Sequence, residues 1–256
     1  MMSHSVMSWI DIRGASLRYA LRPGCGPTLV LIHEMGGSME SWDEVVALLQ
    51  NDFRVLRYDV RGAGMSGKIV AQHGIDEHVA DLEGLLAALD VQGPVAICGI
   101  AVGAAIAMRY AAVRPDRTSH VLALAPACGV AKPAVEATLA LARTLAQDGL
   151  RPAGEPLLDK AYPPALQTDE ARHAAYRARW LSSDPRSLAA MLVMLASLDM
   201  EADLARLPER TVLVGGSFDV LRPPSEIARL ATLAPQAESV ILPTGHMMAT
   251  NSPRLL

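Results

Sequence analysis

The stretch Val95–Gly103, VAICGIAVG, decides how this chain folds. It begins as an apolar run, as expected of a strand covered on both faces, and it ends in two glycines separated by three residues. Small apolar residues follow directly, as in a closely packed helix. The sequence therefore predicts a buried strand, a tight turn and a helix, with Gly99 and Gly103 where a side chain would strike the strand or the helix.

The residue at the tip of this turn is Ala101. A strand–turn–helix of this kind usually carries the pattern Gly-x-Ser-x-Gly, in which the serine hydroxyl is a nucleophile. A methyl group cannot attack a carbonyl carbon, so the sequence contains the frame of a nucleophile turn without its nucleophile. The backbone N–H of Val102, at the start of the helix, is placed to stabilise an oxyanion.

Apolar runs of strand length alternate with helical patterns on both sides of this stretch. Strands of a parallel sheet are buried on both faces and therefore show unbroken apolar runs. We predict an α/β fold with a mostly parallel sheet flanked by helices, which begins with an antiparallel hairpin turned at Gly14. Besides the central strand, the expected strands are 9–12, 16–21, 29–32, 53–58, 119–125, 211–214 and 239–242. The expected helices include 41–49 and 75–89, the latter with Asp76 as its cap.

The alternation of strands and helices stops near Ala131. Only helical stretches follow until about Leu207, after which the strand pattern resumes. We therefore expect a helical cap at 131–207, inserted after the sixth strand, and a core made of residues 1–130 and 208–256. A closing helix is expected soon after Pro253, so we expect the chain to be cut short at Leu256.

Two polar residues follow the last two strands. Asp219 lies just past the strand 211–214, and His246 lies just past the strand 239–242. Each alone could be an ordinary turn or loop residue. Together with Ala101 they stand at the carboxyl edge of the sheet, where ligands bind, in the chain order nucleophile, acid, histidine. We predict that His246 is a base and that Asp219 orients it.

With these residues placed, the chain resembles the α/β-hydrolase superfamily, and within it the β-ketoadipate (3-oxoadipate) enol-lactonase group. The likeness is carried by residues 53–66, FRVLRYDVRGAGMS, and 178–185, ARWLSSDP, and extends over nearly the whole chain. It implies hydrolysis of a small carboxylic ester, lactone or amide by a serine–aspartate–histidine mechanism. A second oxyanion donor is expected from the loop after the strand 29–32, at the N–H of Met35.

Two further residues are candidates for the substrate pocket. Glu34 stands beside Met35, where a small residue is usual. Its carboxylate either pairs locally, or faces the pocket as an acid–base or amine-binding group that would repel an anionic enol-lactone. Trp180, together with Met191 and Met194, either lines the roof of the pocket or belongs to the core of the cap.

Other reactive side chains have structural interpretations. His33 ends a buried strand and is expected to bond to nearby backbone, Cys98 is expected to be a small core residue, and residues 59–66 are expected to form a structural turn. No Gly-x-Gly-x-x-Gly follows a strand, so no organic cofactor is predicted. No metal site is predicted either. His73, His78 and His173 do not form a metal-ligand spacing with carboxylates or cysteines.

Ala101 leaves three interpretations open. In the first, the natural protein has serine there and this chain is an inactivated variant, which removes ~10⁶ in turnover. In the second, alanine is natural and His246 with Asp219 acts as a general base without an acyl-enzyme, as in a lyase, cyclase or cofactor-free oxygenase. In the third, the chain is a non-catalytic, ligand-binding relative of an enzyme.

Composition limits the class of protein further. The chain has 256 residues, of which 51% are hydrophobic and 20% charged, enough for one large domain or a domain with an insert. A net charge of -4 and a pI near 6.0 give no basic surface for nucleic acid. Three cysteines without paired spacing are typical of a reducing compartment, and neither a leader nor a membrane span is evident. We expect a cytoplasmic enzyme, monomeric or homo-oligomeric, with a small-molecule substrate.

Overall fold

An eight-stranded sheet runs through the centre of the computed structural model, which describes residues 6–49, 52–71 and 73–256. Its strand order is β1-β2-β4-β3-β5-β6-β7-β8. The six strands from β4 to β8 in this order are parallel to one another, as predicted, and β2 is antiparallel to both β1 and β4. The strands are β1 (Val6–Ile12), β2 (Ala15–Arg22), β3 (Thr28–Ile32), β4 (Arg54–Tyr58), β5 (Val95–Ile100), β6 (Thr118–Leu124), β7 (Thr211–Gly216) and β8 (Glu238–Leu242).

The first two strands form the predicted hairpin. Ile12 pairs with Ala15, so the turn consists of Arg13 and Gly14, both at positive φ, 50° and 76°. Two such residues give the primed turn whose twist matches that of a hairpin. β1 begins earlier than expected, because it is an edge strand with an exposed face and shows no unbroken apolar run.

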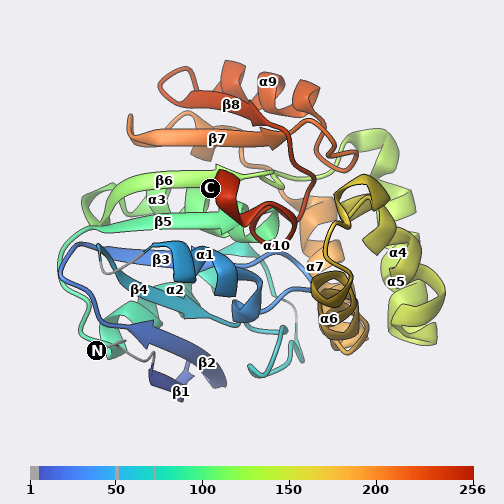
Figure 1. Ribbon diagram of the computed structural model, residues 1–256, viewed down its shortest axis with the longest axis horizontal. Coiled ribbons are helices and arrows are strands. Elements are labelled where there is room, and N and C mark those ends of the chain that lie inside the picture. The colour runs from blue at the N-terminus through green and yellow to red at the C-terminus, as the bar shows by residue number, and fades with distance from the viewer. Residues whose placement is uncertain (1–5, 50–51, 72) are drawn as a thin grey trace.

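Helices cover both faces of the sheet, which explains the apolar character of its central strands. Figure 1 shows α2 and α3 behind the sheet and α1 and α10 in front of it. On β5, Ile97 and Ile100 are fully buried between these layers. The helices of the sheet layers are α1 (Asp43–Leu48), α2 (Ile75–Ala88), α3 (Val102–Val113), α8 (Glu201–Leu204), α9 (Pro224–Leu233) and α10 (Met248–Asn251).

Four of the five α-helices between β6 and β7 lie together beyond the carboxyl ends of the central strands (Figure 1). We call them the cap helices: α4 (Val135–Asp148), α5 (Leu150–Ala161), α6 (Glu170–Leu181) and α7 (Pro185–Ser197). They enclose a hydrophobic cluster of their own, with Leu145, Tyr162 and Trp180 at its centre. The division into a core and a cap at 131–207 stays a prediction.

One local prediction is wrong, and another differs in its bounds. Asp76 does not cap α2: the N-cap is Gly74, whose N–H donates to Glu77 Oε2 at 2.7 Å, while Asp76 lies inside the first turn and accepts a bond from Arg109. The expected helix 41–49 is present as a 3₁₀ turn (Met39–Trp42) that continues as α1. At its start the Met39 N–H donates to Asp59 Oδ1 at 2.8 Å.

The end of the described chain forms α10 and a 3₁₀ turn (Pro253–Leu255) where a closing helix was expected. Further 3₁₀ turns span Pro115–Arg117, Lys132–Ala134 and Pro164–Leu166. Among the described helices, none combines the length and the hydropathy that a bilayer crossing requires.

Candidate active site

The turn between β5 and α3 has the geometry that the sequence predicted. A Cβ on Gly99 would lie 2.2 Å from the Gly103 carbonyl oxygen, and a Cβ on Gly103 would lie 2.3 Å from the carbonyl oxygen of Ile32. Both glycines are therefore required by close backbone approach, one between strand and helix and the other between helix and β3.

Ala101 occupies the tip of this turn at φ 52° and ψ −110°, a conformation that costs a residue with a side chain about 1–3 kcal/mol. Backbone bonds hold it there: its N–H donates to Leu124 at 2.9 Å, and its carbonyl accepts from Ala127 at 3.1 Å. The chain thus keeps the strained backbone that presents residue 101 at the carboxyl edge of the sheet. At this position the chain has a methyl group.

His246 and Asp219 meet beside this turn. His246 Nδ1 lies 2.8 Å from Asp219 Oδ2, and both side chains are buried. The other carboxylate oxygen accepts the backbone N–H groups of Leu221 and Arg222 at 2.8 and 2.9 Å. These bonds hold the carboxylate, so it orients the imidazole, and Nε2 remains as the nitrogen free to accept a proton.

His33 fixes the loop after β3. Its Nε2 accepts the Val60 N–H at 3.0 Å, so the neutral ring carries its proton on Nδ1, which donates to the Glu34 carbonyl at 2.7 Å. A trans peptide turns its carbonyl and its N–H in opposite directions. The Met35 N–H is therefore directed away from His33. This confirms the structural interpretation of His33 and fits Met35 as an oxyanion donor.

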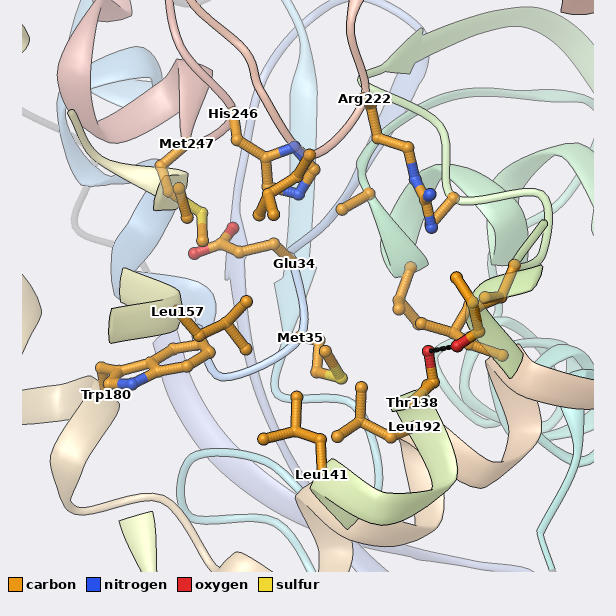
Figure 2. Close-up of a pocket in the computed structure, with 18 residues that line it drawn as sticks. Glu34, Met35, Thr138, Leu141, Leu157, Trp180, Leu192, Arg222, His246 and Met247 are labelled. Carbon is orange, nitrogen blue, oxygen red and sulfur yellow. Dashed lines mark hydrogen bonds between the residues drawn. The ribbon is translucent and has the colours of Figure 1, made fainter. Parts of the chain in front are cut away.

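A cavity of about 270 Å³ lies between this edge of the sheet and the cap helices. Figure 2 shows His246, Met247 and Glu34 on one side and Arg222 across from them. The wall between is largely apolar, so the cavity accommodates a small, mainly apolar ligand. Its lining includes the predicted residues Glu34, Met35, Ala101, Val102, Trp180 and His246.

Glu34 is buried, and its carboxylate bonds to two hydroxyl groups. Oε1 accepts from Ser41 Oγ at 2.8 Å and from Tyr176 Oη at 2.7 Å. A Cβ on Gly37 would lie 2.3 Å from Oε1, so this glycine leaves the room that the carboxylate fills. Burial, and next the neighbouring Glu34, raise the pKa of Tyr176 well above its usual value, so its hydroxyl remains a donor.

Trp180 both lines the cavity and packs in the core of the cap, so neither alternative excludes the other. Its Nε1–H donates to the Gly154 carbonyl at 3.0 Å. A Cβ on Gly36 would lie 2.1 Å from its ring, which shows how closely the indole approaches the loop of Met35. By contrast, Met191 and Met194 belong to the core next to the sheet, and Leu192 and Leu195 of α7 line the cavity instead.

Several residues of the site have no clear signal in the sequence. Tyr176 lies 142 positions from its partner Glu34, and helical periodicity does not identify a partner across the cap. Met247 directly follows His246, and Arg222 lies three positions after Asp219, so their places in the sequence could have identified them as pocket residues. The apolar wall contributed by the cap helices includes Leu141 and Leu157, which show only the spacing of ordinary helix cores.

The remaining structural interpretations hold. Cys98 is buried, and burial raises the pKa of its thiol, which leaves it unreactive. Asp59 accepts N–H bonds from Met39 and Met65, and the Ser66 hydroxyl donates to its carbonyl oxygen at 2.7 Å. The turn 59–66 is therefore loop architecture.

The sequence predicted that His73 and His78 lack a carboxylate at ligand spacing, but the folded chain places one near them. The rings lie edge to face with centroids 4.3 Å apart, and Asp81, one helical turn beyond His78, brings a carboxylate within 4.8 Å of their nitrogens. His73 stands just before α2, and its ring contacts that of His78 inside the helix, which spacing alone does not reveal. Arg61 already donates to both oxygens of Asp81, at 2.6 and 2.7 Å, and its charge repels a cation. We therefore assign no metal to this cluster.

Fold and site together define an enzyme of the α/β-hydrolase class. The family model described as alpha/beta hydrolase fold matches residues 27–252, and the chain belongs to this family. The resemblance seen in the sequence is thereby confirmed.

Similar proteins come from several bacteria. A Pseudomonas syringae protein named as a carbamate hydrolase is 29% identical over 241 residues, 89% of each chain. A 3-oxoadipate enol-lactonase of Acinetobacter baylyi is 24% identical over 75% of this chain and 72% of its own. The solved structure of a hydrolase from Pseudomonas aeruginosa has a TM-score of 0.88 at 26% identity, covering 97% of this chain and 94% of that one.

Proposed function

We propose that this α/β-hydrolase cleaves a small carboxylic ester, lactone or amide in the cavity beneath the cap helices. One observation carries the proposal: His246 is bonded through Nδ1 to Asp219 and stands in the wall of a cavity that also holds the tip of the strand–helix turn. The names of the relatives, a carbamate hydrolase and an enol-lactonase, support acyl chemistry of this kind.

In the chain as it stands, water is the nucleophile. Nε2 of His246 removes a proton from water, the oxygen attacks the carbonyl carbon, and Asp219 stabilises the imidazolium that forms. The N–H groups of Met35 and Val102 hold the oxyanion. When the tetrahedral intermediate collapses, the imidazolium returns the proton to the leaving oxygen or nitrogen, so acid and alcohol, or acid and amine, are released.

This route lacks an acyl-enzyme and is slow. Loss of the serine from such a site lowers turnover by ~10⁶, and a residual ~10³–10⁴ over water comes from binding and the oxyanion hole. The backbone at residue 101 keeps its strained conformation, so a serine there would place its hydroxyl as in an intact site. Ala101→Ser is therefore expected to add the covalent route without rebuilding the fold.

A second candidate function is favoured by Ala101 together with Glu34. A cavity with two acid–base groups, His246 and the buried carboxyl of Glu34, is suited to removing a proton from a carbon or hydroxyl acid. A lyase or cyclase of this type would be active with alanine at position 101 and would gain nothing from serine.

The test is a paired assay of the chain and Ala101→Ser on p-nitrophenyl acetate and a panel of small lactones, with His246→Ala made in both. We expect slow hydrolysis by the unaltered chain and a rate several orders of magnitude higher for Ala101→Ser. His246→Ala should abolish the activity in both backgrounds. The serine variant should also form a one-to-one adduct with a fluorophosphonate. Equal rates with and without His246 in both backgrounds would overturn the proposal.

A further inference from the structure

The carboxylate of Glu34 is held in one orientation by residues from both layers of the molecule. Ser41 precedes α1, and Tyr176 belongs to α6 of the cap, yet both hydroxyls donate to the same oxygen, Oε1. The missing side chain of Gly37 provides the space. A side chain that is 1% exposed and fixed by hydroxyl groups from two elements is part of a built site.

The second oxygen of the same carboxylate, Oε2, is buried and has no hydrogen-bond partner among the described residues. No described cation forms an ion pair with Glu34. Arg222 lines the same cavity but lies across it (Figure 2) and donates to the Gly129 carbonyl. Arg179 lies over the ring of Tyr176, 5.7 Å from its centroid, and not on the carboxylate.

Glu34 is one of the residues that line the cavity, and its buried Oε2 is the acceptor that a donor group of a bound ligand would satisfy. Both hydroxyl donors of the site are used on Oε1, so neither of them satisfies Oε2. A carboxylate buried without a cation is unfavourable, and a cation supplied by a ligand removes that cost. Its place next to Met35 also sets a negative charge beside the oxyanion of the proposed reaction, which is unfavourable unless a positive charge offsets it.

We propose that Glu34 is a specificity-determining residue whose free oxygen binds a protonated amine of the substrate close to the scissile carbonyl. The substrate class is then an ester, lactone or amide that carries an ammonium group near the scissile bond, and anionic substrates are excluded. This inference rests on the proposed function for the identity of the reaction, but not for the binding of the cation.

The test is direct binding of a matched pair of probes, benzylammonium and benzyl alcohol, measured by calorimetry with the full chain near pH 7.5. The probes share size and shape and differ in charge, and neither contains a bond that the protein could hydrolyse. A charge-assisted hydrogen bond in a buried site is worth about 10- to 100-fold in affinity, so the chain should prefer the ammonium by that factor. This ratio is obtained without any substitution.

Glu34→Gln keeps the shape of the side chain and should abolish the preference. Glu238→Gln is the matched control, because Glu238 is exposed on β8 at the far edge of the sheet, and it should leave the preference unchanged. Equal affinity for the two probes in the unaltered chain would overturn the proposal, as would a preference that survives in a folded Glu34→Gln variant. Failure of the ester assay alone would overturn the proposed function and leave the cation site standing.

Discussion

Replacing Asp219 with asparagine should hold His246 in a tautomer that cannot serve as a base. The two backbone N–H groups at Leu221 and Arg222 donate to one carboxylate oxygen, and the imidazole bonds to the other. An asparagine must turn its carbonyl oxygen to the two backbone donors, because its NH₂ group would meet them hydrogen to hydrogen. The NH₂ group then faces Nδ1 of His246, which must become an acceptor, and the ring proton moves to Nε2.

An imidazole that already carries its proton on Nε2 cannot accept another there without becoming an imidazolium that lacks its carboxylate. In the serine protease triad the same substitution lowers kcat about 10⁴-fold through the wrong tautomer. A 10⁴-fold loss corresponds to an increase of about 5.4 kcal/mol in the activation free energy, at 1.36 kcal/mol for each factor of ten. Because the two backbone donors also fix the asparagine here, we expect kcat to fall by about 10³- to 10⁴-fold, with little change in KM.

The assay uses Asp219→Asn in the Ala101→Ser background, with p-nitrophenyl acetate as substrate. In parallel, the nitrogen-15 spectrum of His246 identifies the protonated ring nitrogen without reference to activity. Thermal unfolding of both proteins checks that the fold is kept. A loss of less than ten-fold, or a ring that keeps its proton on Nδ1, would refute the reasoning from the two backbone donors.

Two further predictions concern stability. Gly103→Ala should lower the free energy of unfolding by about 2 kcal/mol or more in a urea titration, because the new Cβ meets backbone of β3 that cannot rotate away, and a loss below 1 kcal/mol would contradict this. Burial lowers the pKa of His78 well below 6.5, so the unfolded chain binds a proton before the folded one does. Stability should therefore fall as pH drops below about 6.5, by up to about 1.4 kcal/mol per pH unit from this residue. His78→Leu should flatten the dependence of Tm on pH between 7.5 and 5, and an unchanged slope would disprove the assignment.

The sheet could be predicted from the sequence because its chemistry is local. An unbroken apolar run such as Val95–Ile100 indicates a strand buried on both faces, and close-set glycines indicate the turn that follows it. The meeting of Ala101, Asp219 and His246 then follows from the rule that the carboxyl ends of parallel strands lie at one edge of the sheet. These inferences need no knowledge of how distant segments pack.

The surroundings of Glu34 could not be predicted, because they depend on long-range packing. Tyr176 reaches the carboxylate from the cap, and Ser41 reaches it from the turn before α1. The local sequence around these two residues does not identify Glu34 as their hydrogen-bond partner. For a similar reason the spacing of His73 and His78 did not reveal the nearby carboxylate of Asp81, because the position of the His73 ring depends on how it packs against α2. Helical periodicity identifies a buried face, but not what lies against it.

The contact between Gly36 and Trp180 has a thermodynamic consequence. Gly36 adjoins Met35, and the indole of α6 lies directly on it, while Arg172 of the same helix forms an ion pair with Glu44 of α1. Entry to the cavity by displacement of α6 would withdraw the indole from this loop. A displacement of α6 would then change both the access to the cavity and the shape of the loop that contains Met35. A ligand that binds more tightly when α6 lies on this loop would stabilise the loop by the same free energy.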